Sequence, residues 1–268
     1  FANKLWNASR FVIMNLTDEN DEFYPMADDA SGDIISRLRD EDKWIISTVN
    51  SAAAEITANM EKFELALAAQ KIYDLIWNNF CDWYIELVKS RLYGDDDADK
   101  EVARYVLVRV LKDLLKLLHP FMPFITEEIW GFLPHNDSEK DAENEKGYLI
   151  RQSWPVYSDG MKFEEEEAVI EAAMDAIRTV RNIRAEAEAA PSKKVNAAIL
   201  AEGAAAEKLK KAEHHIKSQA NVAEITFISD KSELPEEVMS GVITDAEIFI
   251  NMDELMDYNA EFERDRKS

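Results

Sequence analysis

The chain has 268 residues and a formal net charge of −23, with 54 acidic residues against 31 lysines and arginines. A field of that sign repels polyanions, which excludes broad, nonspecific binding to phosphate backbones but not a local site. The composition is 47% hydrophobic with only 7 glycines and 7 prolines, which excludes a disordered chain and favours long helices in one or two domains. The single cysteine, Cys81, excludes an internal disulfide and suits a reducing compartment.

No run of 18 apolar residues occurs, and no basic-then-apolar leader opens the chain. We therefore expect a soluble, cytoplasmic protein with no membrane partner, and we expect it to be monomeric. The first residue, Phe1, already lies in a helical pattern and is not an initiator methionine, so we expect a fragment of a longer protein.

Residues 1–16 are predicted to form a helix with two distinct faces. One face has small and aliphatic residues at the three- and four-residue spacing of a buried stripe: Leu5, Ala8 or Ser9, Val12 and Leu16. The other has amides, cations and one aromatic ring but no acid: Asn3, Asn7 and Arg10, flanked by Lys4 and Phe11. This second face either contacts unpaired nucleotide bases or is a solvated helix face that packs on a neighbour. Periodicity alone favours the solvated face.

The following segments predict a helical bundle. Residues 17–31 are polar and acidic and contain Pro25, which indicates a loop. Four further helices are predicted, at residues 34–60, 61–92, 98–118 and 123–132. The second of these is the most broadly apolar and is therefore expected to be central in the bundle.

The composition changes after residue 160, and helix and strand patterns then alternate. A helix at residues 164–190 is expected to stop at Pro191. The strands and helix that follow are predicted at 195–200, 204–220, 222–228, 241–243 and 247–250, the last two as a hairpin. The predicted fold is mainly α: a helical bundle at 1–160, a small α+β domain at 161–258, and the start of a truncated helix at 259–268.

No catalytic or metal-binding residue is predicted, because the chain has no glycine-rich phosphate loop, no HExxH motif and no cysteine pair at zinc spacing. Cys81 lies in an apolar stripe, where packing is favoured over a role as nucleophile. Three arginines, Arg178, Arg181 and Arg184, share a broad helix face. They either pair with the acids of the chain or contact phosphates, and the pattern leaves both open.

Several stretches closely resemble valyl-tRNA synthetases, in order and at fitting distances along essentially the whole chain. They are Asn-Lys-Leu-Trp-Asn-Ala-Ser-Arg-Phe (3–11), Trp-Asn-Asn-Phe-Cys-Asp-Trp-Tyr-Ile-Glu (77–86), His-Pro-Phe-Met-Pro-Phe-Ile-Thr-Glu-Glu-Ile-Trp (119–130), Ser-Trp-Pro (153–155) and Val-Arg-Asn-Ile-Arg-Ala-Glu (180–186). The second and third are shared in loose form with isoleucyl and leucyl relatives. The stretches at 3–7 and 80–84 are similar to the valyl enzymes in particular.

The resemblance implies the helical anticodon-binding bundle of a class I aminoacyl-tRNA synthetase, followed by its small α+β appendage. The parent enzyme would join valine to its tRNA using ATP. No stretch here resembles His-Ile-Gly-His or Lys-Met-Ser-Lys-Ser, so the catalytic and editing domains are expected to be absent. We therefore expect no cofactor in this fragment, since ATP and Mg²⁺ would belong to the missing catalytic domain. The expected partners are valine-specific tRNA, through its anticodon loop, and that catalytic domain.

The resemblance also reverses the interpretation of the opening helix and implies that its polar face contacts tRNA. Phe11 would stack on a base, Arg10 and Lys4 would donate to base edges or phosphates, and Asn3 and Asn7 would read base edges. Trp6 would pack on the long central helix. The second-rank candidates, for backbone contact or for docking on the catalytic domain, are Arg178, Arg181 and Arg184. The alternatives are the corresponding region of an isoleucyl- or leucyl-type ligase, and a protein-docking helical module with no tRNA role.

Overall fold

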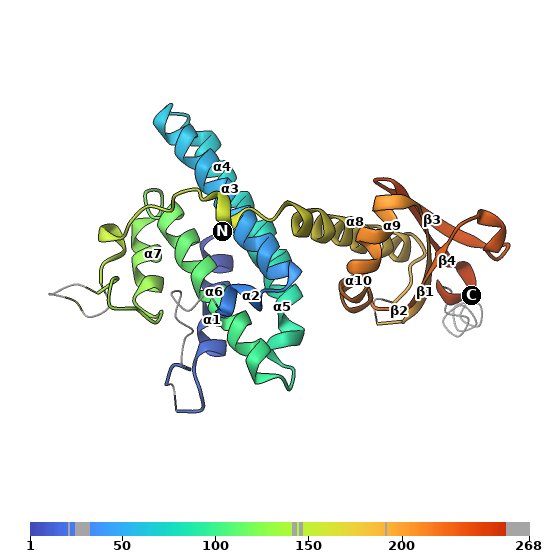
Figure 1. Cartoon of the computed structure of the whole chain (residues 1–268), viewed down its shortest axis with the longest axis horizontal. Helices are drawn as coiled ribbons and strands as arrows, with labels where there is room; N and C mark the ends of the chain where they lie inside the picture. Colours follow the sequence, from blue (N-terminus) through green and yellow to red (C-terminus); the bar gives the residue numbers. More distant parts are fainter. Residues whose placement is uncertain (21, 25–32, 141–143, 145–146, 191, 256–268) are drawn as a thin grey trace, which may run out of the picture. The chain divides into compact units, whose positions relative to one another are not determined.

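The structure is a computed structural model that describes residues 1–20, 22–24, 33–140, 144, 147–190 and 192–255 (Figure 1). The chain forms two compact units, Phe1–Glu167 and Ala168–Ser268, and the division falls inside helix α8 (Glu164–Glu186). The described part is mainly helical with one small sheet, which confirms the predicted fold class. Within it, no helix is long and apolar enough to cross a membrane.

The first unit is a bundle of helices. Its elements are α1 (Ala2–Leu16), α2 (Asp33–Ser36), α3 (Asp40–Glu61), α4 (Leu65–Asp74), the π-helix η2 (Leu75–Tyr84), α5 (Ile85–Leu92), α6 (Asp97–Leu118), α7 (Pro123–Trp130), and the short 3-10 turns η3 (Leu149–Arg151) and η4 (Asp159–Met161). Helix α6 contacts α1, α3, α4, α5 and α7, so it shares the centre of the bundle with the predicted central helix. The buried stripe predicted for the opening helix is confirmed on α1.

The prediction of one helix at residues 34–60 is wrong, because two helices occupy this range. Helix α2 ends at Ser36 and α3 begins at Asp40. The Asp42 carboxylate accepts a hydrogen bond from the backbone N–H of Arg39 at 3.1 Å and so caps α3. The backbone N–H groups at the start of a helix have no acceptor within the helix. A side chain that accepts from one of them therefore stabilises a new helix start at this position.

Residues 61–92 contain the predicted long helix, but its middle is not α-helical. After a turn in which Phe63 has φ 60°, α4, η2 and α5 follow one another without a gap. The central 10 residues, Leu75–Tyr84, form the π-helix η2. In a π-helix each hydrogen bond joins residues five apart instead of four, so side chains five apart lie on one side. Trp77 and Asp82 are five residues apart, and both contact Lys4 of α1.

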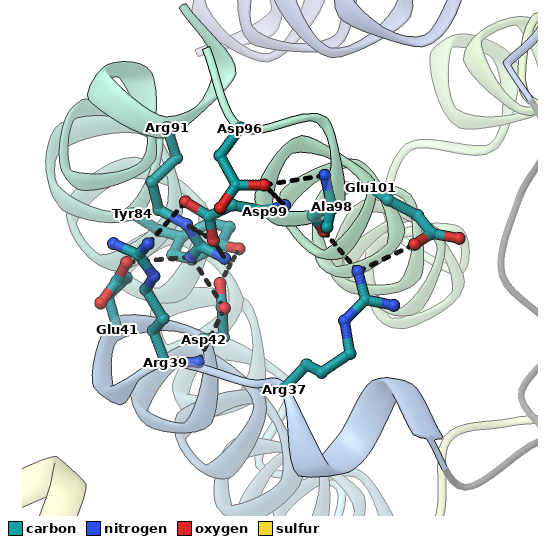
Figure 2. Close-up of polar contacts among 10 residues, drawn as sticks. All are labelled: Arg37, Arg39, Glu41, Asp42, Tyr84, Arg91, Asp96, Ala98, Asp99 and Glu101. Carbon is teal, nitrogen blue, oxygen red and sulfur yellow. Dashed lines mark hydrogen bonds and ion pairs between the residues drawn. The ribbon is translucent and has the colours of Figure 1, made fainter. Parts of the chain in front are cut away.

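A buried ion network joins α3, η2, α5 and α6 (Figure 2). The Arg91 guanidinium, with its side chain 3% exposed, lies 2.9 Å from Glu41 Oε1, 2.7 Å from Asp42 Oδ2 and 2.9 Å from Asp99 Oδ1. The Tyr84 hydroxyl donates to the other oxygen of Asp42 at 2.8 Å. One cation from α5 therefore holds the first turns of both α3 and α6.

Burial dominates the electrostatics of this network. It raises the pKa of Asp42, although the charge of Arg91 opposes the shift, and it also raises the pKa of Tyr84. Burial by itself would lower the pKa of the Arg91 guanidinium. The nearby carboxylates of Asp42 and Glu41 have the larger effect and raise this pKa. Charges buried in this way are retained only when they are paired and hydrogen-bonded.

Two more arginines pair with acidic residues of α6 next to this network. Arg39 contacts Asp99 at 2.8 Å, and Arg37 contacts Glu101 at 2.9 Å and donates to the carbonyl of Ala98. Asp96 caps α6 by accepting from two backbone N–H groups of its first turn. The segment between α2 and α3 is thereby tied to the start of α6 (Figure 2).

The second unit is the predicted small α+β fold. Its elements after α8 are β1 (Val195–Ala201), α9 (Gly203–Lys211), α10 (Glu213–Ala220), β2 (Val222–Ile228), the 3-10 turn η5 (Lys231–Glu233), β3 (Val238–Ile243), β4 (Ala246–Asn251) and α11 (Met252–Leu255). The strand order is β2-β1-β4-β3, with β1 and β2 parallel and the other pairs antiparallel. The predicted hairpin at 241–250 is confirmed as β3 and β4.

Helix α8 lies close against strand β3 at Gly241. A Cβ atom at this position would lie 2.4 Å from the Thr179 methyl group, so only glycine fits without movement. The helix ends at Glu186, before the predicted end at 190, and Glu188 follows with φ 50°. The predicted helix at 204–220 is also interrupted, at Ala212. Pro25, Pro191 and the predicted helix at 259–268 lie outside the described residues.

The ion network leads to a stability prediction. The variant Arg91→Met leaves buried carboxylates without their cation, and we expect it to lower the free energy of unfolding by about 3–5 kcal/mol. Urea titration followed by tryptophan fluorescence measures this, because all 6 tryptophans lie in the first unit.

The matched control is Lys71→Ala, which removes a surface cation paired with Glu55 at 2.5 Å, where the two side chains are 38% and 53% exposed. It should leave the urea midpoint unchanged, since exposed ion pairs contribute little. Equal midpoints for the control and Arg91→Met would contradict the role given to Arg91.

Candidate nucleic-acid interface

The polar face of α1 is open to solvent. Asn3, Asn7 and Arg10 are exposed, and no hydrogen bond or ion pair joins their side chains to another of the described residues. Phe11 is half-buried on the same side. Helix α1 itself contains no acidic residue. The predicted residues therefore do form one accessible surface, which we call the α1 face: Asn3, Lys4, Asn7, Arg10 and Phe11.

Lys4 differs from the rest of the α1 face because its ammonium group is already engaged. Its Nζ atom lies 2.5 Å from Asp82 Oδ1 and 3.8 Å from the centroid of the Trp77 ring. An ammonium over an indole face gains a cation–π attraction in addition to the ion pair. Lys4 is thus held against η2 and does not extend freely into solvent.

An aromatic stack holds the start of α1 in place. The rings of Tyr73 and Trp77 are stacked at 5.5 Å with an interplanar angle of 13°, and Phe1 lies 5.3 Å from Tyr73. Offset aromatic pairs at such distances add attraction beyond the apolar area that they bury. Trp6, predicted to pack on the long central helix, makes its ring contact with Phe132 just beyond α7.

A further cation reaches the α1 face from α5. Lys89 Nζ lies 5.7 Å from the centroid of the Phe11 ring and 2.5 Å from Glu86 Oε1. Phe11 therefore has a cation beside its ring. The α1 face and its surroundings therefore combine one aromatic ring, free amides and several cations. These groups can stack on unpaired bases and form hydrogen bonds with them.

The three arginines of α8 occupy different environments. Arg178 is exposed and pairs with Asp175 at 3.1 Å. Arg181 is exposed and donates to the carbonyl of Gln219 at 2.8 Å. Arg184 is buried and donates to the carbonyl of Ala220 at 2.9 Å, and burial lowers the pKa of its guanidinium. Their predicted contact with tRNA or with a catalytic domain stays a prediction.

Comparison with known proteins places this geometry in a family. Residues 42–199 match the family described as the anticodon-binding domain of tRNA ligase. The chain belongs to the anticodon-binding domain family of tRNA ligases. The matched range begins within α3, so α1 precedes it.

Longer relatives match almost the whole chain, α1 included. The chain is 41% identical to the valine–tRNA ligase of Clostridium acetobutylicum over 264 residues, and 42% identical to that of Clostridium tetani over 265 residues. It is 38% identical to the valine–tRNA ligase of Bacillus cereus over 262 residues. These alignments cover 97–98% of this chain but only 28% of each relative, so the chain spans just over a quarter of their length.

Sequence reasoning missed three residues that this anticodon-binding domain brings to the α1 face: Trp77, Asp82 and Lys89. Trp77 belongs to the broadly apolar helix predicted at 61–92, but it is half-buried and its ring supports Lys4. The helical periodicity of the sequence cannot show that these residues lie beside α1, because they are brought there by the packing of helices that are distant in the chain. Lys89 gives no local signal either, because a cation is ordinary near the C-terminus of a helix.

Cys81 lies next to this site, and the structure supports packing as its role. Burial raises the pKa of the Cys81 thiol to about 11, while the Lys4 ammonium acts in the opposite direction. The thiol is therefore protonated, and a poor nucleophile, at neutral pH.

The pKa of Cys81 predicts slow alkylation. Relative to an ordinary pKa of 9.0, a pKa of about 11 lowers the thiolate fraction at pH 8 roughly 100-fold. We expect iodoacetamide, followed by mass spectrometry, to modify the native chain correspondingly more slowly than the urea-unfolded chain. The stabilising effect of the protonated thiol is complete below pH 9 and is lost as the pH rises through 11.

The variant Lys4→Met should slow the reaction further, because it removes the cation that lowers this pKa. Equal alkylation rates for the native and unfolded chains at pH 8 would contradict this environment for Cys81.

Proposed function

We propose that this chain is the anticodon-binding region of a valine–tRNA ligase and that its α1 face contacts the anticodon loop of a valine-specific tRNA. One observation carries the proposal: in a chain of net charge −23, α1 is a helix without acids whose amides and arginine are exposed and without partners among the described residues. The family match and the valine–tRNA ligase relatives support it.

The chemistry of the α1 face suits a single-stranded loop better than a duplex. Unpaired bases expose a flat surface and their hydrogen-bonding edges. Phe11 supplies a ring for stacking, Asn3 and Asn7 supply donors and acceptors, and Arg10 supplies a forked donor for a base edge or a phosphate. Lys89 adds a cation next to Phe11.

The acidic charge of the chain limits how much affinity this face can supply. Phosphate contacts release counterions and fall steeply with salt, and the overall field opposes the approach of RNA. We therefore expect weak, salt-sensitive binding by this region alone. Arg178 and Arg181, exposed on α8, remain second-rank candidates for backbone contact or for docking on a catalytic domain, and Arg184 is the third.

The remaining parts of the function belong to a longer protein in this proposal. Relatives more than three times as long as this chain carry the name valine–tRNA ligase. Activation of valine with ATP and Mg²⁺ would occur in their additional length, with which this region would cooperate in the cytoplasm. We propose no cofactor for the chain itself, and we expect the region to be monomeric.

Two variants test the α1 face. We expect Phe11→Ala and Arg10→Ala each to weaken binding of a valine anticodon stem-loop, measured by fluorescence anisotropy at low salt. Losing one stacked base costs about 1–3 kcal/mol, which is roughly a five- to 150-fold increase in Kd.

Matched controls separate contact from general effects. Phe63→Ala removes an 87% exposed phenylalanine at the α3–α4 turn, and Lys62→Ala removes the exposed cation next to it. Neither should change Kd appreciably. If all four variants bind the stem-loop as the unmodified chain does, the α1 face does not contact the loop.

A further inference from the structure

Asp82, a carboxylate from another helix, pairs directly with a residue of the α1 face. Asp82 of η2 has its side chain 48% exposed, and its Oδ1 atom accepts from Lys4 Nζ at 2.5 Å. Its second oxygen, Oδ2, has no hydrogen-bond partner among the described residues. An ionised carboxylate can accept several hydrogen bonds, so Oδ2 remains available for a ligand.

The position of this carboxylate is fixed more firmly than in an ordinary surface ion pair. Trp77 and Asp82 lie on one side of the π-helix, and both contact Lys4. The Trp77 ring is itself stacked on Tyr73. Because Lys4 is held by a ring and a carboxylate together, less side-chain entropy remains to be lost when a ligand binds.

Lys4, the partner of Asp82, adjoins both of the predicted base-reading amides on α1. Asn7 follows Lys4 by three residues on α1, a spacing that places the two Cβ atoms roughly 5–6 Å apart. The carboxylate held by Lys4 therefore borders the stretch of α1 that carries Asn3 and Asn7. No other acid pairs with a residue of the α1 face in the part of the chain that the structure describes.

An amide and a carboxylate discriminate between bases differently. The side chains of Asn3 and Asn7 each contain a donor and an acceptor, so rotation of the amide lets them pair with an amino or a carbonyl group. An ionised carboxylate only accepts. It attracts the exocyclic amino group of cytosine or adenine and repels the O4 carbonyl of uracil at the corresponding position.

We propose that Asp82 is a specificity-determining residue of the α1 face, which accepts a hydrogen bond through Oδ2 from the exocyclic amino group of an unpaired base. Lys4 is the positioning residue that holds the carboxylate. This inference rests on the proposed function, because it assumes that an unpaired RNA loop occupies the α1 face. In this inference Lys4 contacts Asp82 of the protein and does not bind a phosphate of the RNA.

The test compares RNA loops that differ by one functional group. The probes are a valine anticodon stem-loop and copies that each lack one exocyclic amino group. In these copies a loop cytosine is replaced by uracil, a loop adenine by purine riboside, or a loop guanine by inosine. For the unmodified chain we expect at least one replacement to raise Kd about tenfold, within the range that one specific base contact supplies. With Asp82→Asn, that ratio should fall to about one.

The matched control is Asp97→Asn, which neutralises an exposed acid that also pairs with a lysine, in this case Lys100. Both variants reduce the net negative charge by one, and this change by itself should affect the binding of all loops equally. Only Asp82→Asn should remove the discrimination. Lys4→Met should reduce discrimination in part, and Lys4→Arg should restore it, whereas a purely structural lysine would change Kd for all loops equally.

Three outcomes separate the possibilities. If Asp82→Asn keeps the ratio of the unmodified chain, Asp82 is only a surface ion-pair partner and the inference is overturned. If the unmodified chain binds every loop equally, the α1 face reads no amino group, and the inference fails while RNA binding stands. If the unmodified chain binds no stem-loop in a low-salt buffer, the proposed function itself is contradicted. Urea midpoints from tryptophan fluorescence show whether each variant is folded.

Discussion

The buried contact of Arg91 with carboxylates of α3 and α6 is the constraint on which the first unit depends. Desolvation offsets much of the Coulomb attraction in such networks, so we infer that this one mainly fixes how the helices align. Arg91 lies on α5, directly continuous with η2. By fixing α5, the network also fixes where Trp77, Asp82 and Lys89 meet α1. The geometry of the exposed site thus depends on buried charges behind it.

Periodicity predicted the features that depend only on the residues within a single helix or strand. It gave the two faces of α1, the hairpin of β3 and β4, and the accessible set from Asn3 to Phe11, because these residues share one short element. It failed at the start of α3, where a cap depends on Asp42, and at η2, where the hydrogen bonds join residues five apart. The contact of Lys4 with Asp82 spans 78 residues, a separation at which no local pattern is informative.

The distribution of charge suggests how affinity and selectivity are divided. A chain of net charge −23 is poorly suited to attract RNA over a distance, yet α1 carries no acid. Short-range stacking and hydrogen bonding survive in such a field better than long-range attraction does. The α1 face is therefore better suited to distinguish bases than to capture the molecule. In a protein more than three times as long, other surfaces are free to supply the affinity.

The central claim is that an anticodon loop occupies the α1 face, and an NMR titration of the chain with the stem-loop tests it most directly. Binding should shift the amide and side-chain signals of Asn3, Asn7, Arg10 and Phe11, together with those of Lys89, whose ammonium lies near the Phe11 ring. Signals from the α3–α4 turn at Phe63 should stay unchanged. Shifts confined to α8 or to the α3–α4 turn, with α1 unaffected, would contradict the claim.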